Sequence, residues 1–132
     1  MTTVDPQELL PEIDREFLKG KEYAFSVEQV GGPLHLTIRN FELSAAYTPS
    51  VADSLLIILP AGYPNSNPDM FWTIPDVKLT NGNWPAQSNH HETYGDRVWQ
   101  RWSRHLQRAW RPGIDNLRTY LATIRQELAR GI

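Results

Sequence analysis

The 132-residue chain contains no cysteine. This absence excludes disulfide bonds, thiolate ligands for a metal and a cysteine nucleophile. The chain also lacks an apolar run of the roughly 18 residues that a membrane-spanning helix needs. Residues 1–8 have neither the basic nor the apolar region of a signal peptide. We therefore expect a cytoplasmic protein without a membrane span.

Neither sign of charge is in large excess. The chain has 13 Lys and Arg against 15 Asp and Glu, a net charge of −2 at pH 7. This balance argues against a general nucleic-acid-binding protein, although it is compatible with a local basic patch. A hydrophobic content of 40% is that of an ordinary globular protein. We expect residues 1–132 to form a single domain.

The hydrophobic pattern predicts an α+β domain that begins and ends with a helix. One helix is predicted within 5–20, and the clearest amphipathic helix spans 114–128. Between them, alternating apolar residues predict a four-stranded antiparallel meander with strands at 22–30, 34–39, 53–59 and 70–74. The third strand is almost entirely apolar, which is typical of a strand covered on both faces. We therefore expect the C-terminal helix to pack on the sheet.

Two segments between these elements are rich in turn-forming residues. A proline-rich loop spans 60–69, between the third and fourth predicted strands. A long polar loop is predicted from Pro75 to Asp96, with Asn81-Gly82 as a turn. Loops of this length in compact domains are usually functional or mobile.

Tryptophan and arginine are concentrated in residues 97–113. Helical spacing relates the apolar residues Trp99, Trp102 and Leu106, and it also relates the arginines Arg97, Arg101, Arg104, Arg108 and Arg111. A helix here would have one aromatic face in the core and one basic face in solvent. The basic face predicts contact with an acidic surface or a C-terminal carboxylate of a protein partner. The candidate contact residues are Arg97, Arg101, Arg104 and Arg108. The alternative is a core-anchoring segment with solvated arginines.

Two motifs and the order of the elements resemble the ubiquitin-conjugating enzyme (UBC) superfamily. Residues 60–68 read Pro-Ala-Gly-Tyr-Pro-Asn-Ser-Asn-Pro. This is similar to the superfamily's Pro-x-x-Tyr-Pro-x-x-Pro-Pro signature, with Asn67 in place of one proline. The motif residues that match are Pro60, Tyr63, Pro64 and Pro68. Further on, Trp110, Pro112 and the helix that follows are similar to the Trp-Ser-Pro element and its helix. The resemblance implies a UBC-like fold.

The resemblance also implies partners. Together with the run from Trp99 to His105, the two motifs are similar to a bacterial branch of the superfamily. Members of that branch are associated with ubiquitin-like proteins, activating-enzyme-like adenylyltransferases and JAB-type peptidases in modification or defence operons. The implied partners are therefore a ubiquitin-like protein and an activating-enzyme-like protein, and the implied setting includes antiviral defence.

The chain departs from the superfamily pattern at the catalytic position. Counting back seven or eight residues from Trp110, as the family spacing implies, reaches Ser103 or Trp102 instead of a cysteine. No His-Pro-Asn tripeptide precedes this position, and ten residues after Pro68 is Lys78, shortly before Asn81. We therefore expect a non-catalytic component that binds the ubiquitin-like protein or the activating enzyme without a thioester.

Three alternatives stay open. In the first, Ser103 accepts the modifier as an oxyester, with His105 or a loop histidine as base. Its oxyanion would be stabilised by Asn81, Asn83 or Asn89; otherwise the Ser103 hydroxyl bonds local backbone, as most serines do. In the second, the arginines and tryptophans bind nucleic acid. In the third, His90, His91, Glu92 and His105 bind a metal. Adjacent histidines rarely face the same way, so we expect no metal and no cofactor.

Overall fold

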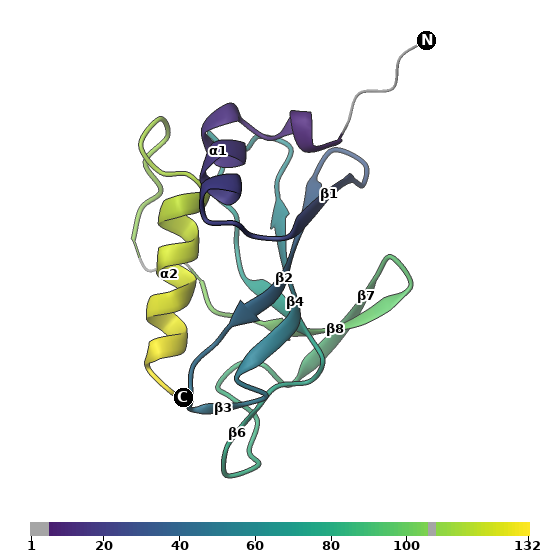
Figure 1. The fold of residues 1–132 in the computed structure, drawn as a ribbon, viewed down its shortest axis with the longest axis vertical. Helices are drawn as coiled ribbons and strands as arrows, with labels where there is room; N and C mark the ends of the chain where they lie inside the picture. The colour runs from purple at the N-terminus through teal and green to yellow at the C-terminus, as the bar shows by residue number, and fades with distance from the viewer. Residues whose placement is uncertain (1–5, 106–107) are drawn as a thin grey trace.

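The computed structural model describes residues 6–105 and 108–132. Within these ranges an antiparallel sheet carries helix α2 across one face, and helix α1 lies beside the first turn of α2 (Figure 1). The elements are η1 (Pro6–Leu9), α1 (Glu12–Gly20), β1 (Phe25–Gln29), β2 (Leu34–Glu42), β3 (Tyr47–Thr48), β4 (Val51–Leu59), β5 (Phe71–Ile74), β6 (Lys78–Leu79), β7 (His90–Tyr94), β8 (Arg97–Trp102) and α2 (Leu117–Ala129).

The α+β class and the two terminal helices agree with the sequence prediction, but the sheet is larger than predicted. Its strand order is β1-β2-β4-β5-β8-β7, and β3 pairs separately with β6. The segment predicted as a long loop, 75–96, therefore contains β6 and β7. Strand β7 escaped prediction because it is an edge strand with exposed or half-buried side chains, so it needs no alternation of apolar residues.

The prediction of a helix over residues 97–113 is wrong. Residues 97–102 form strand β8, and residues 103–105 and 108–116 contain no helix or strand. Trp99 and Trp102 point to opposite faces of the sheet, and each face has its own buried cluster. Trp102 stacks on Phe71 at 5.2 Å beneath α2, whereas Trp99 packs with Leu56 on the other face. Leu106, which was predicted on the same aromatic face, lies outside the described residues.

Strand β4 is covered on both faces, as its apolar run predicted. Leu55, Ile57 and Leu59 are fully buried in the core that contains α2. Leu56 points the other way and is buried beside Trp99 of β8. Helix α2 covers the first face, and the β7–β8 hairpin covers part of the second (Figure 1).

Helix α1 starts at Glu12, directly after Pro11, and ends at Gly20, within the predicted range 5–20; Asp5 lies outside the described residues. Helix α2 begins later than predicted. Helix α2 starts at Leu117, where Asn116 and Thr119 form a capping box. Ile114 precedes the helix and is 60% exposed. Neither helix, nor any other in the described ranges, is long and apolar enough to cross a membrane.

Candidate functional site

A buried carboxylate joins α1, the proline-rich loop and α2. Asp14 is 1% exposed. Its Oδ2 accepts a 2.6 Å hydrogen bond from the hydroxyl of Tyr63, and its Oδ1 accepts one of 3.1 Å from the backbone N–H of Leu117. Burial raises the pKa of Asp14, and the two hydrogen bonds oppose that shift. The motif tyrosine thus ties its loop to the first residue of α2 through one side chain of α1.

Trp110 provides a second contact that holds the loop of residues 60–69. Its Nε1–H donates to the carbonyl oxygen of Pro64 at 2.8 Å, and its ring lies 6.2 Å from that of Tyr63. The backbone N–H of Tyr63 donates to the oxygen of Pro60 at 2.9 Å, which forms the turn of the loop. Pro68 is buried, and Pro112 is exposed. The motif residues that carry the resemblance therefore hold the 60–69 loop against residues 108–116.

We expect Tyr63→Phe to lower the free energy of unfolding by about 2 kcal/mol near neutral pH, because a buried carboxylate loses a donor. A raised pKa favours the protonated form of Asp14 in the fold, so its contribution to stability falls as pH rises above the unfolded value of 3.8. Losing the Tyr63 donor raises that pKa further. Urea unfolding should therefore show that Tyr63→Phe loses less unfolding free energy below pH 3.8 than at neutral pH.

Tyr23→Phe is the matched control for that measurement, because the Tyr23 hydroxyl bonds only the exposed side chain of Arg125 among the described residues. Its replacement should change stability by less than about 0.5 kcal/mol. Equal losses for the two variants would contradict the role given to Asp14.

Ser103 lies directly after β8, at the end of the sheet where β5 begins, because Trp102 pairs with Phe71. It is half-buried. Its Oγ accepts a hydrogen bond from Nε of Arg101 at 3.0 Å, and its backbone N–H donates to the oxygen of Gln87 at 2.8 Å. The sequence-predicted hydroxyl is thus held beside a guanidinium group.

His105 lies close to the same end of the sheet. Its Nδ1 is 2.8 and 3.0 Å from the two carboxylate oxygens of Asp69, the second residue before β5. A carboxylate at Nδ1 fixes the ring and favours the tautomer with its proton on that nitrogen. Asp69 was not predicted as a site residue, because its approach to His105 depends on the pairing of β5 with β8, and β8 was not predicted.

The three candidate asparagines do not lie together. Asn89 lies beside the segment that carries Ser103. Its neighbour His90 pairs with Arg101, and the backbone N–H of Ser103 donates to Gln87. Asn81 and Asn83 instead form the turn after β6, where Oδ1 of Asn81 accepts from the N–H of Asn83 at 2.9 Å. Of the three, Asn89 is the one brought near Ser103.

The candidate histidines do not converge on a metal. His90 and His91 are consecutive in β7, so their side chains point to opposite faces. Nε2 of His91 lies 2.7 Å from Oδ1 of Asp76, away from His105 and its partner Asp69. Within residues 6–105 and 108–132, no group of three or more His, Cys, Asp and Glu side chains is placed to hold an ion.

Arg104 lies in the protein interior. It is 6% exposed, and its guanidinium donates to the carbonyl oxygens of Ala86, Glu127 and Ile132. Its guanidinium carbon also lies 4.9 Å from the ring centre of Trp102. The proposed basic face is therefore wrong at this position, because Arg104 binds the last turn of α2 and the end of the chain.

The other three candidate arginines do not form one basic row. Arg97 and Arg101 lie on the same face of β8, the face opposite α2, where Arg97 pairs with Asp53 at 3.6 Å and Arg101 pairs with Glu92 at 3.4 Å. Arg108 lies beyond the end of β8 and makes a bidentate pair with the buried carboxylate of Asp115, at 2.8 and 2.9 Å. Because β8 ends at Trp102 and Arg104 is buried, the predicted row does not continue from Arg97 and Arg101 to Arg108.

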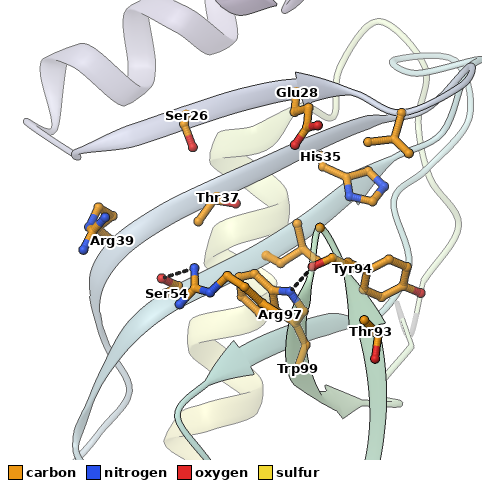
Figure 2. A pocket seen from close by; sticks show the side chains of 13 residues that line it. Ser26, Glu28, His35, Thr37, Arg39, Ser54, Thr93, Tyr94, Arg97 and Trp99 are labelled. Atoms are coloured by element: carbon orange, nitrogen blue, oxygen red, sulfur yellow. Dashed lines mark hydrogen bonds between the residues drawn. The ribbon is translucent and has the colours of Figure 1, made fainter.

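A groove of about 490 Å³ lies on the sheet face opposite α2 (Figure 2). Side chains of β1, β2 and β4 form its floor, and the β7–β8 hairpin forms its wall. Arg97 is the only one of the four candidate contact arginines that lines it. This groove could not be predicted from the sequence, because its wall is the β7–β8 hairpin, which was not predicted.

A family model described as Prokaryotic E2 family E matches residues 10–131. No curated protein and no solved structure matches the chain. The match agrees with the resemblance to a bacterial E2-like family and supports an E2-like role in a ubiquitin-like conjugation pathway. It also suggests interaction with ubiquitin-like proteins and activating enzymes in general. Since the match spans nearly the whole sequence, the chain belongs to prokaryotic E2 family E.

Proposed function

We propose that this chain binds the ubiquitin-like protein or the activating enzyme of its pathway without forming a thioester. The observation that carries the proposal is the absence of cysteine from all 132 residues. A thioester requires a thiolate, and a serine hydroxyl is a weak nucleophile at neutral pH. The hydrogen bonds of Asp14, Tyr63 and Trp110 nevertheless hold together the motif residues that resemble the superfamily. A family member that keeps these motif residues but lacks the usual nucleophile fits a binding role.

The surface best suited to this binding lies at the end of the molecule that carries α1. Leu9, Ile13 and Ile114 are 42%, 61% and 60% exposed. Asp14 of α1 bonds the first residue of α2, so Ile13 and Ile114 lie on neighbouring segments (Figure 1). Exposed apolar side chains that gather in one region are typical of protein–protein contacts.

Ile13→Glu should therefore weaken binding of the pathway partner at least ~10-fold, because an apolar contact is replaced by a charge. Calorimetry with the ubiquitin-like protein and with the activating enzyme, each alone, measures this and identifies the partner. Val98→Glu is the matched control, since Val98 on β8 is also 61% exposed. Equal affinities for the two variants, or no binding by the unmodified chain, would overturn the proposal.

A second candidate function is conjugation through an oxyester at Ser103. The contact between His105 and Asp69 favours it, because a carboxylate that orients an imidazole is the arrangement of a general base. Oγ of Ser103 would attack the activated C-terminal carbonyl carbon of the modifier. The hydroxyl proton of Ser103 would pass to His105, and the group that had carried the activated modifier would leave from the carbonyl carbon. Nε–H of Arg101 would stabilise negative charge on Oγ of Ser103 during the attack.

This second function predicts an adduct that resists thiols, is cleaved by hydroxylamine and is lost in Ser103→Ala. Asp69→Asn should slow its formation ~10-fold or more, since the ring of His105 loses its orienting charge. Asp76→Asn is the matched control, because Asp76 contacts a different histidine, His91, at 2.7 Å. Equal rates in the two aspartate variants would remove His105 as the base.

A further inference from the structure

The groove on the sheet face opposite α2 is built from alternate residues of three strands. Ser54 and Leu56 of β4 face it, whereas Leu55 and Ile57 face α2. Figure 2 shows the β7–β8 hairpin opposite β1 and β2, with Arg97 reaching toward Ser54 of β4. This site contains none of the residues of the proposed α1 surface, so the inference below does not rest on that proposal.

One end of the groove is basic. Nη2 of Arg39 and Nη2 of Arg97 lie 3.9 and 3.6 Å from the two carboxylate oxygens of Asp53. Nη1 of Arg97 also donates to Oγ of Ser54 at 3.4 Å, and the guanidinium lies 4.9 Å from the ring centre of Trp99. Two cations share one carboxylate at long distances, which leaves a net positive charge. Guanidinium groups held in this way bind a carboxylate well.

The other end has the opposite character. Glu28 of β1 pairs in register with His35 of β2, and both line the groove. The ring of His35 lies edge-on to Tyr94 at 5.5 Å. Burial lowers the pKa of His35, and the charge of Glu28 opposes that shift. A carboxylate beside a largely neutral imidazole makes this end attractive to a cation and repels a polyanion.

The groove has the length and the lining of a peptide site. It follows β2 from Arg39 to His35, which corresponds to about 13 Å of extended chain. Hydroxyl groups of Ser26 and Thr37, which pair across β1 and β2, line it between its two ends. A ligand with a carboxylate at one end and a cationic or neutral end opposite fits this order of charges.

We propose that this groove binds the C-terminal end of an extended peptide from a protein partner. The terminal carboxylate lies between Arg39 and Arg97, and the preceding residues run along β2 toward Glu28. The volume of about 490 Å³ is in the range of sites that enclose a small ligand. A nucleic acid would place further phosphates beside Glu28, so the charge order favours a peptide.

The test uses the full chain and two probes, the peptide acetyl-Lys-Val-Thr-Val with a free carboxylate and the same peptide as its C-terminal amide. Nitrogen-15 NMR follows each titration up to about 1 mM peptide. The free acid should shift the backbone resonances of Thr37, Ser54 and Gly95. The amide should bind at least ~10-fold more weakly than the free acid, because the pairing with two arginines needs the negative charge.

Arg97→Gln should also weaken binding of the free acid ~10-fold, and Arg39→Gln should act in the same direction. Arg118→Gln, at an exposed position on α2 outside the groove, is the matched control and should leave the affinity unchanged. Equal affinity of acid and amide, or no groove shifts with either peptide, overturns the proposal. Groove shifts that depend on protein concentration without peptide would assign the face to a second copy and overturn it as well.

Discussion

Replacing Arg104 by alanine is expected to lower the free energy of unfolding by about 3 kcal/mol. Its guanidinium donates to three carbonyl oxygens from separate parts of the chain, those of Ala86, Glu127 and Ile132. The oxygen of Glu127, in the last turn of α2, also accepts the backbone N–H of Arg130 at 3.2 Å, so Arg104 gives it a second donor. Since Arg104 is 6% exposed, water cannot readily replace these donors.

Urea unfolding of Arg104→Ala and Arg104→Lys measures this effect. The lysine variant keeps the charge but loses the planar set of donors, so it should recover less than half of the loss. Arg125→Ala is the matched control, because Arg125 also lies over an aromatic ring, 4.6 Å from that of Phe41, yet is exposed. A loss for Arg104→Ala no larger than that for Arg125→Ala would contradict the interior role.

Asp115→Asn is expected to lower the free energy of unfolding by about 2 kcal/mol at neutral pH. The Asp115 side chain is fully buried, and Arg108, Arg111 and the backbone N–H of Arg111 all donate to it. The Arg108 guanidinium is the main cause that holds the pKa of Asp115 well below its usual range. Both guanidinium groups are about half exposed, so screening keeps the loss moderate.

The pH dependence of this variant has a defined sign. A depressed pKa in the fold gives stability that is fully present above the unfolded value of 3.8 and is lost as pH falls below it. Urea unfolding should therefore separate Asp115→Asn from the unmodified chain at about pH 7 and bring them together in strong acid. Asp96→Asn, in the exposed turn between β7 and β8, is the control and should not show this pattern. A loss that is constant with pH would contradict the ionic account.

The elements that sequence analysis found are those with a strong periodic pattern. The apolar run of β4 and the three-to-four spacing of α2 both reflect burial on defined faces. Strand β7 has no such pattern, because its residues lie at an edge of the sheet. In β8, Trp99 and Trp102 are both buried but on opposite faces. Two tryptophans three residues apart therefore matched the spacing of a helix face although they lie in a strand.

The site was predicted less completely, for a related reason. Tyr63, Pro64 and Trp110 were found through their resemblance to family motifs, but the hydrogen bond between Trp110 and Pro64 and the role of Asp14 join residues far apart in the sequence and were not predicted. Asp69 approaches His105 only because β5 pairs with β8. Such contacts depend on strand order and register, and a single sequence does not specify either.

The measurement that tests the central claim most directly is the intact mass of the full chain after incubation with its ubiquitin-like protein, activating enzyme and ATP, combined with gel filtration of the same mixture. Binding without a thioester predicts an unchanged mass and co-elution with one partner. It also predicts that Ile13→Glu abolishes co-elution and that Val98→Glu does not. A covalent adduct that is lost in Ser103→Ala, or the absence of both adduct and complex, would contradict it.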